Sequence, residues 1–233
     1  MTFFVLGTLI LLALLSWATY KTAAFLAAVP PQANMLLLPG ENLVRIALIA
    51  VCIALGRVSG LPIARLGWSP SNPLPELVIG CLVGVLVALS LPPLTRLAVK
   101  RFGTRVYSPV VVLAVVPRSR QEWRWVPLAL VTSVLLEELL FRSLLLGGFS
   151  SFLPTVPLML IWSILFGTMH LPQGNLGMLA ASVLGLLLSI LFILTGSLLA
   201  PFVSHYTIDL LQMIWAYHDK NWLDAIGTAS NHP

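Results

Sequence analysis

The sequence predicts an all-α protein, a polytopic bundle of transmembrane helices with about seven spans. Of its 233 residues, 58% are hydrophobic and only 9% are charged, whereas a soluble domain usually carries about 25% charged residues. A spanning helix needs roughly 20 mostly apolar residues, and once loops are subtracted the chain has room for about seven of them. Proline and glycine clusters separate the apolar runs, and no stretch outside these runs is long enough to form a soluble domain.

The apolar runs set the expected spans in chain order. No basic segment precedes the first run, so we interpret it as a spanning helix and not as a cleaved signal peptide. The loop after it, 21–42, contains Pro30-Pro31 and Pro39-Gly40 and is itself apolar, which suits either a position in the membrane interface or an extension of the first helix. The expected spans are 3–20, 43–60, 76–96, 125–147, 155–171, 175–194 and 197–217.

The net charge of +5 at pH 7 is concentrated at 96–124, from the end of the third run to the start of the fourth, where seven of the thirteen Lys and Arg residues lie. Basic residues of membrane proteins gather in cytoplasmic loops, where they meet anionic lipid. We therefore expect lipid and not nucleic acid as the partner of this region, with the loop at 97–124 in the cytoplasm. Seven spans then place the N-terminus outside and the C-terminus inside.

We expect three parts along the chain. Residues 1–124 hold three spans and the basic loop, 125–217 hold a helical core that carries the candidate site, and 218–233 form a short C-terminal tail.

Six ionisable groups lie inside the later apolar runs. Insertion scales charge about 2.5–3.5 kcal/mol for Asp, Lys or Arg at a helix centre, so the set costs on the order of 10 kcal/mol, which is comparable with the net stability of a domain. Groups this costly face the bundle interior and meet one another, and they mark chemistry or a transport path more often than packing. The six are Glu137, Glu138, Arg142, His170, His205 and Asp209.

The spacing of the first three groups predicts different surroundings for two adjacent carboxylates. Glu138 and Arg142 are four residues apart, so they share a helix face and are expected to form an ion pair. Glu137 is turned about 100° from Glu138, so it points elsewhere and is less compensated. Two neighbouring carboxylates in separate environments are what an acid–base site needs.

The other groups also have helical spacing. His205 and Asp209 share a face four residues apart, and Pro201 lies one turn before His205, so we expect a bend in the last span there. Phe166 and His170 share a face in the same way, and the proline at position 172 favours a helix end just after the histidine.

In chain order, these residues form three motifs. Glu137–Arg142 reads E-E-x-x-x-R, Phe166–His170 reads F-x-x-x-H, and His205–Asp209 reads H-x-x-x-D. Each motif alone is weak. All three together, in this order and each inside an apolar run, resemble the CPBP family, which holds the type II CAAX prenyl endopeptidases and the bacterial bacteriocin-processing and immunity (ABI) proteins. The resemblance covers about 125–216.

The resemblance implies an intramembrane endopeptidase of the glutamate-and-histidine type that needs no cofactor. Glu137 would be the general base, His170 its orienting partner, and His205 a donor to the developing oxyanion. A carboxylate can take a proton from water and return it to the leaving amine, and preorganised donors stabilise the oxyanion in a low-dielectric site.

The remaining motif residues have supporting or open roles. Glu138 and Arg142 would hold the helix of the first glutamate in position, and Phe166 would wall the pocket. Asp209 departs from the prenyl proteases, which carry Asn at this position, and an ionised Asp would repel an oxyanion. A protonated Asp209, an Asp209 that orients His205, and a metal ligand are the alternatives.

Three other functions stay open from the residues alone. A zinc-dependent protease could use the histidines and acidic groups, although the sequence has no H-E-x-x-H pair. A proton-coupled transporter could use the same carboxylates as a relay, and a non-enzymatic immunity or scaffold protein could keep them for folding. For a protease we expect a peptide or lipidated protein as substrate, and the plasma membrane of a prokaryote as the location.

Overall fold

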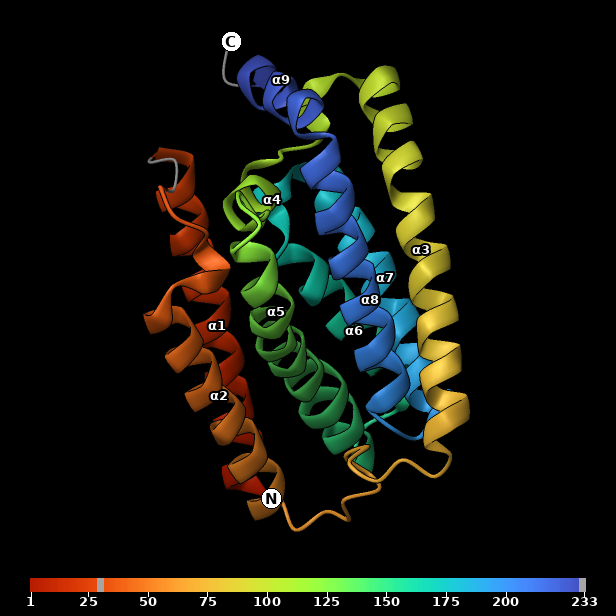
Figure 1. Cartoon of the computed structure of the whole chain (residues 1–233). Helices are drawn as coiled ribbons and strands as arrows, with labels where there is room; N and C mark the ends of the chain where they lie inside the picture. Colours follow the sequence, from red (N-terminus) through yellow and green to blue (C-terminus); the bar gives the residue numbers. More distant parts are fainter. Residues whose placement is uncertain (29–31, 231–233) are drawn as a thin grey trace.

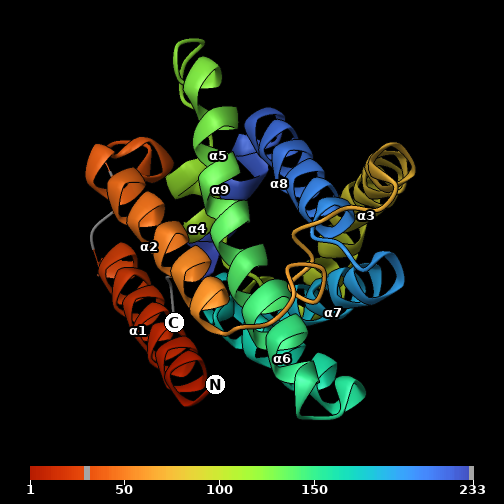
Figure 2. The ribbon, with the colours of Figure 1, turned by 90° about the horizontal axis from the view of Figure 1, so that it is seen from below.

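The computed structural model describes residues 1–28 and 32–230, and this part of the chain is a bundle of helices without strands. Figure 1 shows α1 and α2 on one flank and α3 on the opposite flank, with α5 to α8 between them, and the view from below in Figure 2 gives the same order. The long helices are α1 (Thr2–Ala28), α2 (Pro39–Val58), α3 (Pro73–Phe102), α5 (Glu122–Glu138), α6 (Thr155–Thr168), α7 (Gly174–Thr195) and α8 (Leu199–His218). The short elements are η1 (Met35–Leu37), η2 (Thr104–Val106), α4 (Val110–Val115), η3 (Leu139–Gly148), η4 (Phe149–Ser151), η5 (Leu171–Gln173) and α9 (Lys220–Ser230).

Three helical stretches are long and apolar enough to cross a membrane by length and composition: Thr2–Leu26, Pro73–Phe102 and Leu171–Thr195. Helix α6 is a shorter apolar helix. The outer face of α3 exposes Leu82, Leu86 and Leu89, which is a surface that suits lipid and not water. The all-α prediction is confirmed, while the count of seven spans stays a prediction.

Prolines and a glycine set several helix boundaries as the sequence indicates. Pro73 occupies the first position of α3, where its missing N–H costs nothing because that donor has no intrahelical partner. Pro154 precedes α6 as its N-cap residue. Helix α7 ends at Gly196, whose φ of 67° is left-handed and therefore favours glycine.

Two segments are more helical than predicted. The loop expected at 97–124 is wrong in its first part, because α3 continues to Phe102, and α4 then forms within it. Lys100 and Arg101 lie in the last turn of α3, where cations interact favourably with the helix dipole. Helix α1 extends to Ala28, in agreement with the helix-extension alternative for the first loop, and Pro30-Pro31 lies outside the described residues.

The C-terminal tail is also helical. Helix α9 buries Leu223 and Ile226, which pack with Ala216 of α8 and with Tyr107; the amphipathic pattern is too short to stand out in the sequence. His232 lies outside the described residues. The bend expected at Pro201 is not needed, because α8 begins at Leu199 and its first turn tolerates proline.

The segment η3 is a π-helix that continues directly from α5, and all ten of its residues are buried. Its side chains form much of the largest apolar cluster, which α1, α2, α6 and α7 complete. π-Helical turns are rare and are found frequently at functional sites. Here the turn carries Arg142 into the centre of the bundle.

Helices α3 and α8 pack closely through small residues. Gly80, Gly84 and Ala88 are spaced by four and are all buried. A Cβ atom on Gly84 would collide with Thr207 and with the carbonyl oxygen of Ser204. Small residues at this spacing let two membrane helices approach closely.

We predict that Gly84→Leu destabilises the fold by about 1–3 kcal/mol, because the added side chain overpacks the contact between α3 and α8. Thermal unfolding in detergent measures the change. Cys81→Leu on the exposed side of the same helix is the matched control and should leave the midpoint nearly unchanged. Equal midpoints for the two variants would mean that the contact is loose.

Candidate functional site

Glu138 and Arg142 form the ion pair that their spacing predicts. Arg142 Nη1 lies 3.1 Å from Glu138 Oε1, and the two side chains are only 1% and 0% exposed. Arg142 Nη2 also donates to the carbonyl oxygen of Gly185 in α7 at 3.3 Å. The guanidinium lies 4.9 Å from the ring centroid of Phe166, within the range of a cation–π contact. Arg142 thus connects three helices through one buried charge.

His205 on α8 is bound to the same carboxylate. Its Nδ1 lies 2.8 Å from Glu138 Oε1, which makes Nδ1 the donor, since an ionised carboxylate only accepts. Its Nε2 faces the other two acidic groups, 3.8 Å from Glu137 Oε2 and 3.6 Å from Asp209 Oδ2. Glu138 therefore fixes the ring and leaves Nε2 for the opposite side of the site.

Glu137 lines a cleft and its side chain is 35% exposed, while the side chain of Glu138 beside it is fully buried. The two adjacent carboxylates therefore have the separate environments that the helical geometry predicts. The cleft has a volume of about 380 Å³ and is walled by α1, α2, α5, α6 and α4. One wall is apolar and comes from the N-terminal helices: Leu15, Ala18, Ala23, Leu26, Val44 and Leu48.

His170 follows α6 and lines the same cleft as Glu137. Its Nδ1 lies 2.8 Å from the backbone carbonyl oxygen of Phe166. Because a carbonyl oxygen accepts, Nδ1 carries the proton, and Nε2 of the neutral ring is then an acceptor. The Phe166 ring packs against His170 at a centroid distance of 4.7 Å. Among the described residues, no hydrogen bond or ion pair joins His170 to Glu137.

The structure brings the predicted residues together in two neighbouring groups. Glu137, His205 and Asp209 are held around the Glu138–Arg142 pair, and His170 lies across Phe166, whose ring also contacts that of His205 at 5.9 Å. Phe166 therefore contacts both histidines and Arg142.

Sequence reasoning missed two contributors. The carbonyl oxygen of Gly185 binds Arg142, and backbone acceptors carry no residue signature. Arg45 of α2 lines the cleft with Glu137 and His170. Its position in an apolar run could have been noticed, because ionisable groups inside spans mark functional sites.

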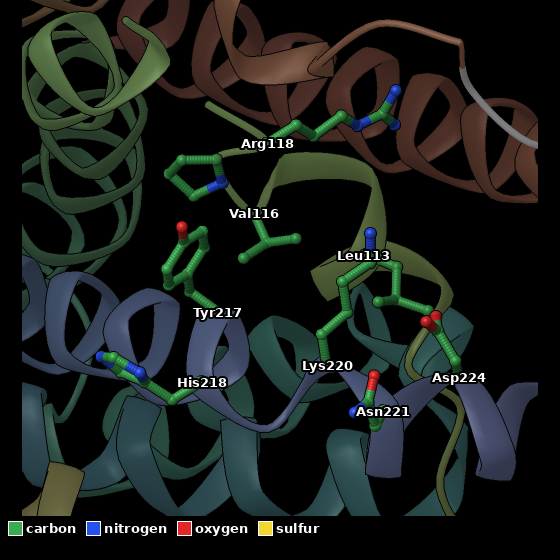
Figure 3. Close-up of a pocket in the computed structure, with 9 residues that line it drawn as sticks. Leu113, Val116, Arg118, Tyr217, His218, Lys220, Asn221 and Asp224 are labelled. Atoms are coloured by element: carbon green, nitrogen blue, oxygen red, sulfur yellow. The ribbon is translucent and has the colours of Figure 1, made fainter. Parts of the chain in front are cut away.

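A second pocket, of about 630 Å³, lies at another place in the fold and contains none of the motif residues. Figure 3 shows Leu113 of α4 and Val116 at its C-terminal end, which line the pocket together with Tyr217, Lys220 and Asn221 from the junction of α8 and α9. Its lining mixes basic, acidic and apolar side chains.

In the part of the chain that the structure describes, no three His, Cys, Asp or Glu side chains are arranged to hold a metal ion. Within the motif cluster, Glu138 is shared by Arg142 and His205.

Residues 119–211 match the sequence pattern of one family, described as type II CAAX prenyl endopeptidase Rce1-like. The matched segment contains all three motifs and covers less than half of the chain. Helices α1, α2 and α3 lie outside it. No curated protein and no solved structure matches the chain.

We predict that Arg142→Ala destabilises the protein by about 3–5 kcal/mol, because it leaves the Glu138 carboxylate buried without its cation. Unfolding in detergent measures the loss, and the yield of folded protein should fall with it. Arg96→Ala is the matched control, since Arg96 pairs with Asp219 at an exposed site where an ion pair contributes about 0–1 kcal/mol. Similar stability of the two variants would refute the structural role of the buried pair.

Proposed function

Since residues 119–211 belong to the CPBP family of type II CAAX prenyl endopeptidase-like proteins, we propose that this integral membrane protein is an endopeptidase that cleaves membrane-associated peptides with a water activated by Glu137 and His170. The observation that carries the proposal is the cleft. It presents one carboxylate whose side chain is 35% exposed and one histidine, beside a second carboxylate that is buried and paired with Arg142.

In this proposal, Glu137 acts as the general base. Its carboxylate accepts a proton from a water molecule in the cleft, and the water oxygen attacks the carbonyl carbon of the scissile peptide bond. The proton then passes to the nitrogen of the leaving amine as the C–N bond breaks. The Nδ1 bond of His170 to the Phe166 carbonyl leaves Nε2 to accept a hydrogen bond from the second O–H of the water and so to orient it.

In this proposal, His205 stabilises the oxyanion. Its Nδ1–H is committed to Glu138 at 2.8 Å, so donation to an oxyanion requires a proton on Nε2 as well. Three carboxylates lie within 4 Å of the ring, and their charge favours such a cationic ring. Asp209 then acts on His205, 3.6 Å from Nε2, and does not itself donate to the oxyanion. This role agrees with Asp at a position where the prenyl proteases carry Asn.

The proposed substrate is a prenylated or otherwise membrane-anchored peptide. The apolar wall formed by α1 and α2 suits an aliphatic chain or an apolar segment that enters from the lipid. A leader peptide that is held at the membrane has the same chemistry, so the substrate panel contains both kinds.

We predict that Glu137→Ala and His170→Ala each lower kcat by about 10²–10⁴-fold, which is the usual size of a general acid–base contribution, while both proteins stay folded. The assay incubates purified protein in detergent with farnesylated CAAX peptides and hydrophobic leader peptides, and mass spectrometry locates each cut.

Asp224→Asn is the control, since Asp224 is an exposed acid of α9 that lies outside the motif cluster. Cleavage by the Glu137→Ala variant at the wild-type rate would contradict the role of Glu137 as the base. Absence of cleavage by folded wild-type protein across the whole panel, together with substrate uptake into liposomes that Glu137→Gln abolishes, would favour a proton-coupled transporter.

We also predict that a metal chelator leaves the cleavage rate unchanged, because Glu137 and His170 together activate the water in this proposal. The comparison uses the same wild-type assay with and without 1,10-phenanthroline. Activity that the chelator abolishes and zinc restores would instead identify a zinc-dependent hydrolase.

A further inference from the structure

Arg45 is a cation in an apolar wall that the proposed chemistry does not use. It lies on α2 within the run 43–60, and its side chain is only 18% exposed. Its two polar contacts are both long: Nη1 lies 3.4 Å from the carbonyl oxygen of Leu36, and Nη2 lies 3.7 Å from Glu41 Oε2. A guanidinium has five donors in a fixed fork, so these contacts leave much of its binding capacity unused.

The depth of Arg45 matches that of the candidate base. Thr132 of α5 donates to Asn42 of α2 at 3.4 Å, and the two helices run in the same direction in Figure 1. With a rise of about 1.5 Å per residue, Arg45 lies about 4.5 Å and Glu137 about 7.5 Å beyond this contact. Arg45 and Glu137 are therefore nearly level, and both line the same cleft.

The position of one cation beside the candidate base suggests a ligand with one negative charge near its reacting bond. The side chain of Glu41 is 46% exposed and holds Arg45 only loosely. A carboxylate matches the fork of a guanidinium with two parallel hydrogen bonds, and it could displace Glu41 without the folding of any new element. Among the described residues that line the cleft, Arg45 is the only lysine or arginine that could bind this negative charge.

We propose that Arg45 binds the free C-terminal carboxylate of the substrate and so selects peptide bonds close to the C-terminus. The inference rests on the proposed endopeptidase function and adds a specificity residue from α2, outside the matched segment. With Arg45 and Glu137 level in one cleft of about 380 Å³, the leaving peptide is short. A bond far from a free C-terminus would leave the guanidinium without its partner.

Binding tests the inference separately from catalysis. The probe is a fluorescent farnesylated CAAX peptide, prepared either with a free C-terminal carboxylate or as the C-terminal amide. Both forms are titrated onto detergent-purified Glu137→Ala protein, which keeps the peptide intact. We expect the free acid to bind at least about tenfold more tightly than the amide, as for a charge-assisted hydrogen bond. The substitution Arg45→Gln should remove this difference by weakening the acid alone.

Two further variants sharpen the result. Arg57→Gln changes an exposed arginine at the far end of α2 and should keep the full preference for the acid. Glu41→Gln removes the competing carboxylate and should keep or increase that preference, whereas a purely structural Glu41–Arg45 pair predicts weaker binding of both peptides.

The inference is overturned if the acid does not bind, if the acid and amide bind equally, or if Arg45→Gln weakens both forms to the same extent. The last result would mean that Arg45 supports the fold or the cleft in general. Wild-type cleavage of acid and amide at equal rates would likewise overturn the inference while leaving the proposed function intact. Acid-selective binding without cleavage would support the carboxylate site and count against the protease.

Discussion

The buried carboxylate of Glu138 is the constraint on which the rest of the site depends. One oxygen, Oε1, lies 3.1 Å from Arg142 and 2.8 Å from His205. The side chain of Glu138 is 0% exposed. A charge in such surroundings is very costly unless it is paired and hydrogen-bonded. The end of α5, the π-helix η3 and helix α8 are therefore held in one relative position, and the carbonyl of Gly185 adds α7 to the same network.

This constraint also gives Glu137 its different character. The two glutamates are adjacent in the chain, but a helix turns each residue by about 100°, so a position that buries one directs the other to the cleft. Glu138 pairs with the guanidinium of Arg142. Glu137 lies between His205 and the cleft, and its side chain is 35% exposed. The same packing thus buries one carboxylate in the network and leaves the adjacent carboxylate facing the cleft.

Sequence patterns predicted the parts of this arrangement that are local. Four-residue spacing gave the Glu138–Arg142 and His205–Asp209 pairs. The pairing of His205 with Glu138, 67 residues apart, was not predicted, because periodicity defines the face of a helix but not the helix it will meet. The ten-residue π-helix likewise has no composition that separates it from an α-helix.

The cleft shows how the two halves of the chain divide the work in the proposed function. The motif residues lie within 119–211, yet one wall of the cleft comes from α1 and α2, for which the sequence offered no resemblance. Residues that activate water must keep a fixed geometry, whereas wall residues need only match a substrate. A helix pair outside the matched segment can therefore change which peptide enters, and where it is cut, without disturbing the network around Glu138. In this proposal the outer helices also contribute a charged group to substrate binding. That group is Arg45, a cation of α2 that lines the cleft nearly level with Glu137.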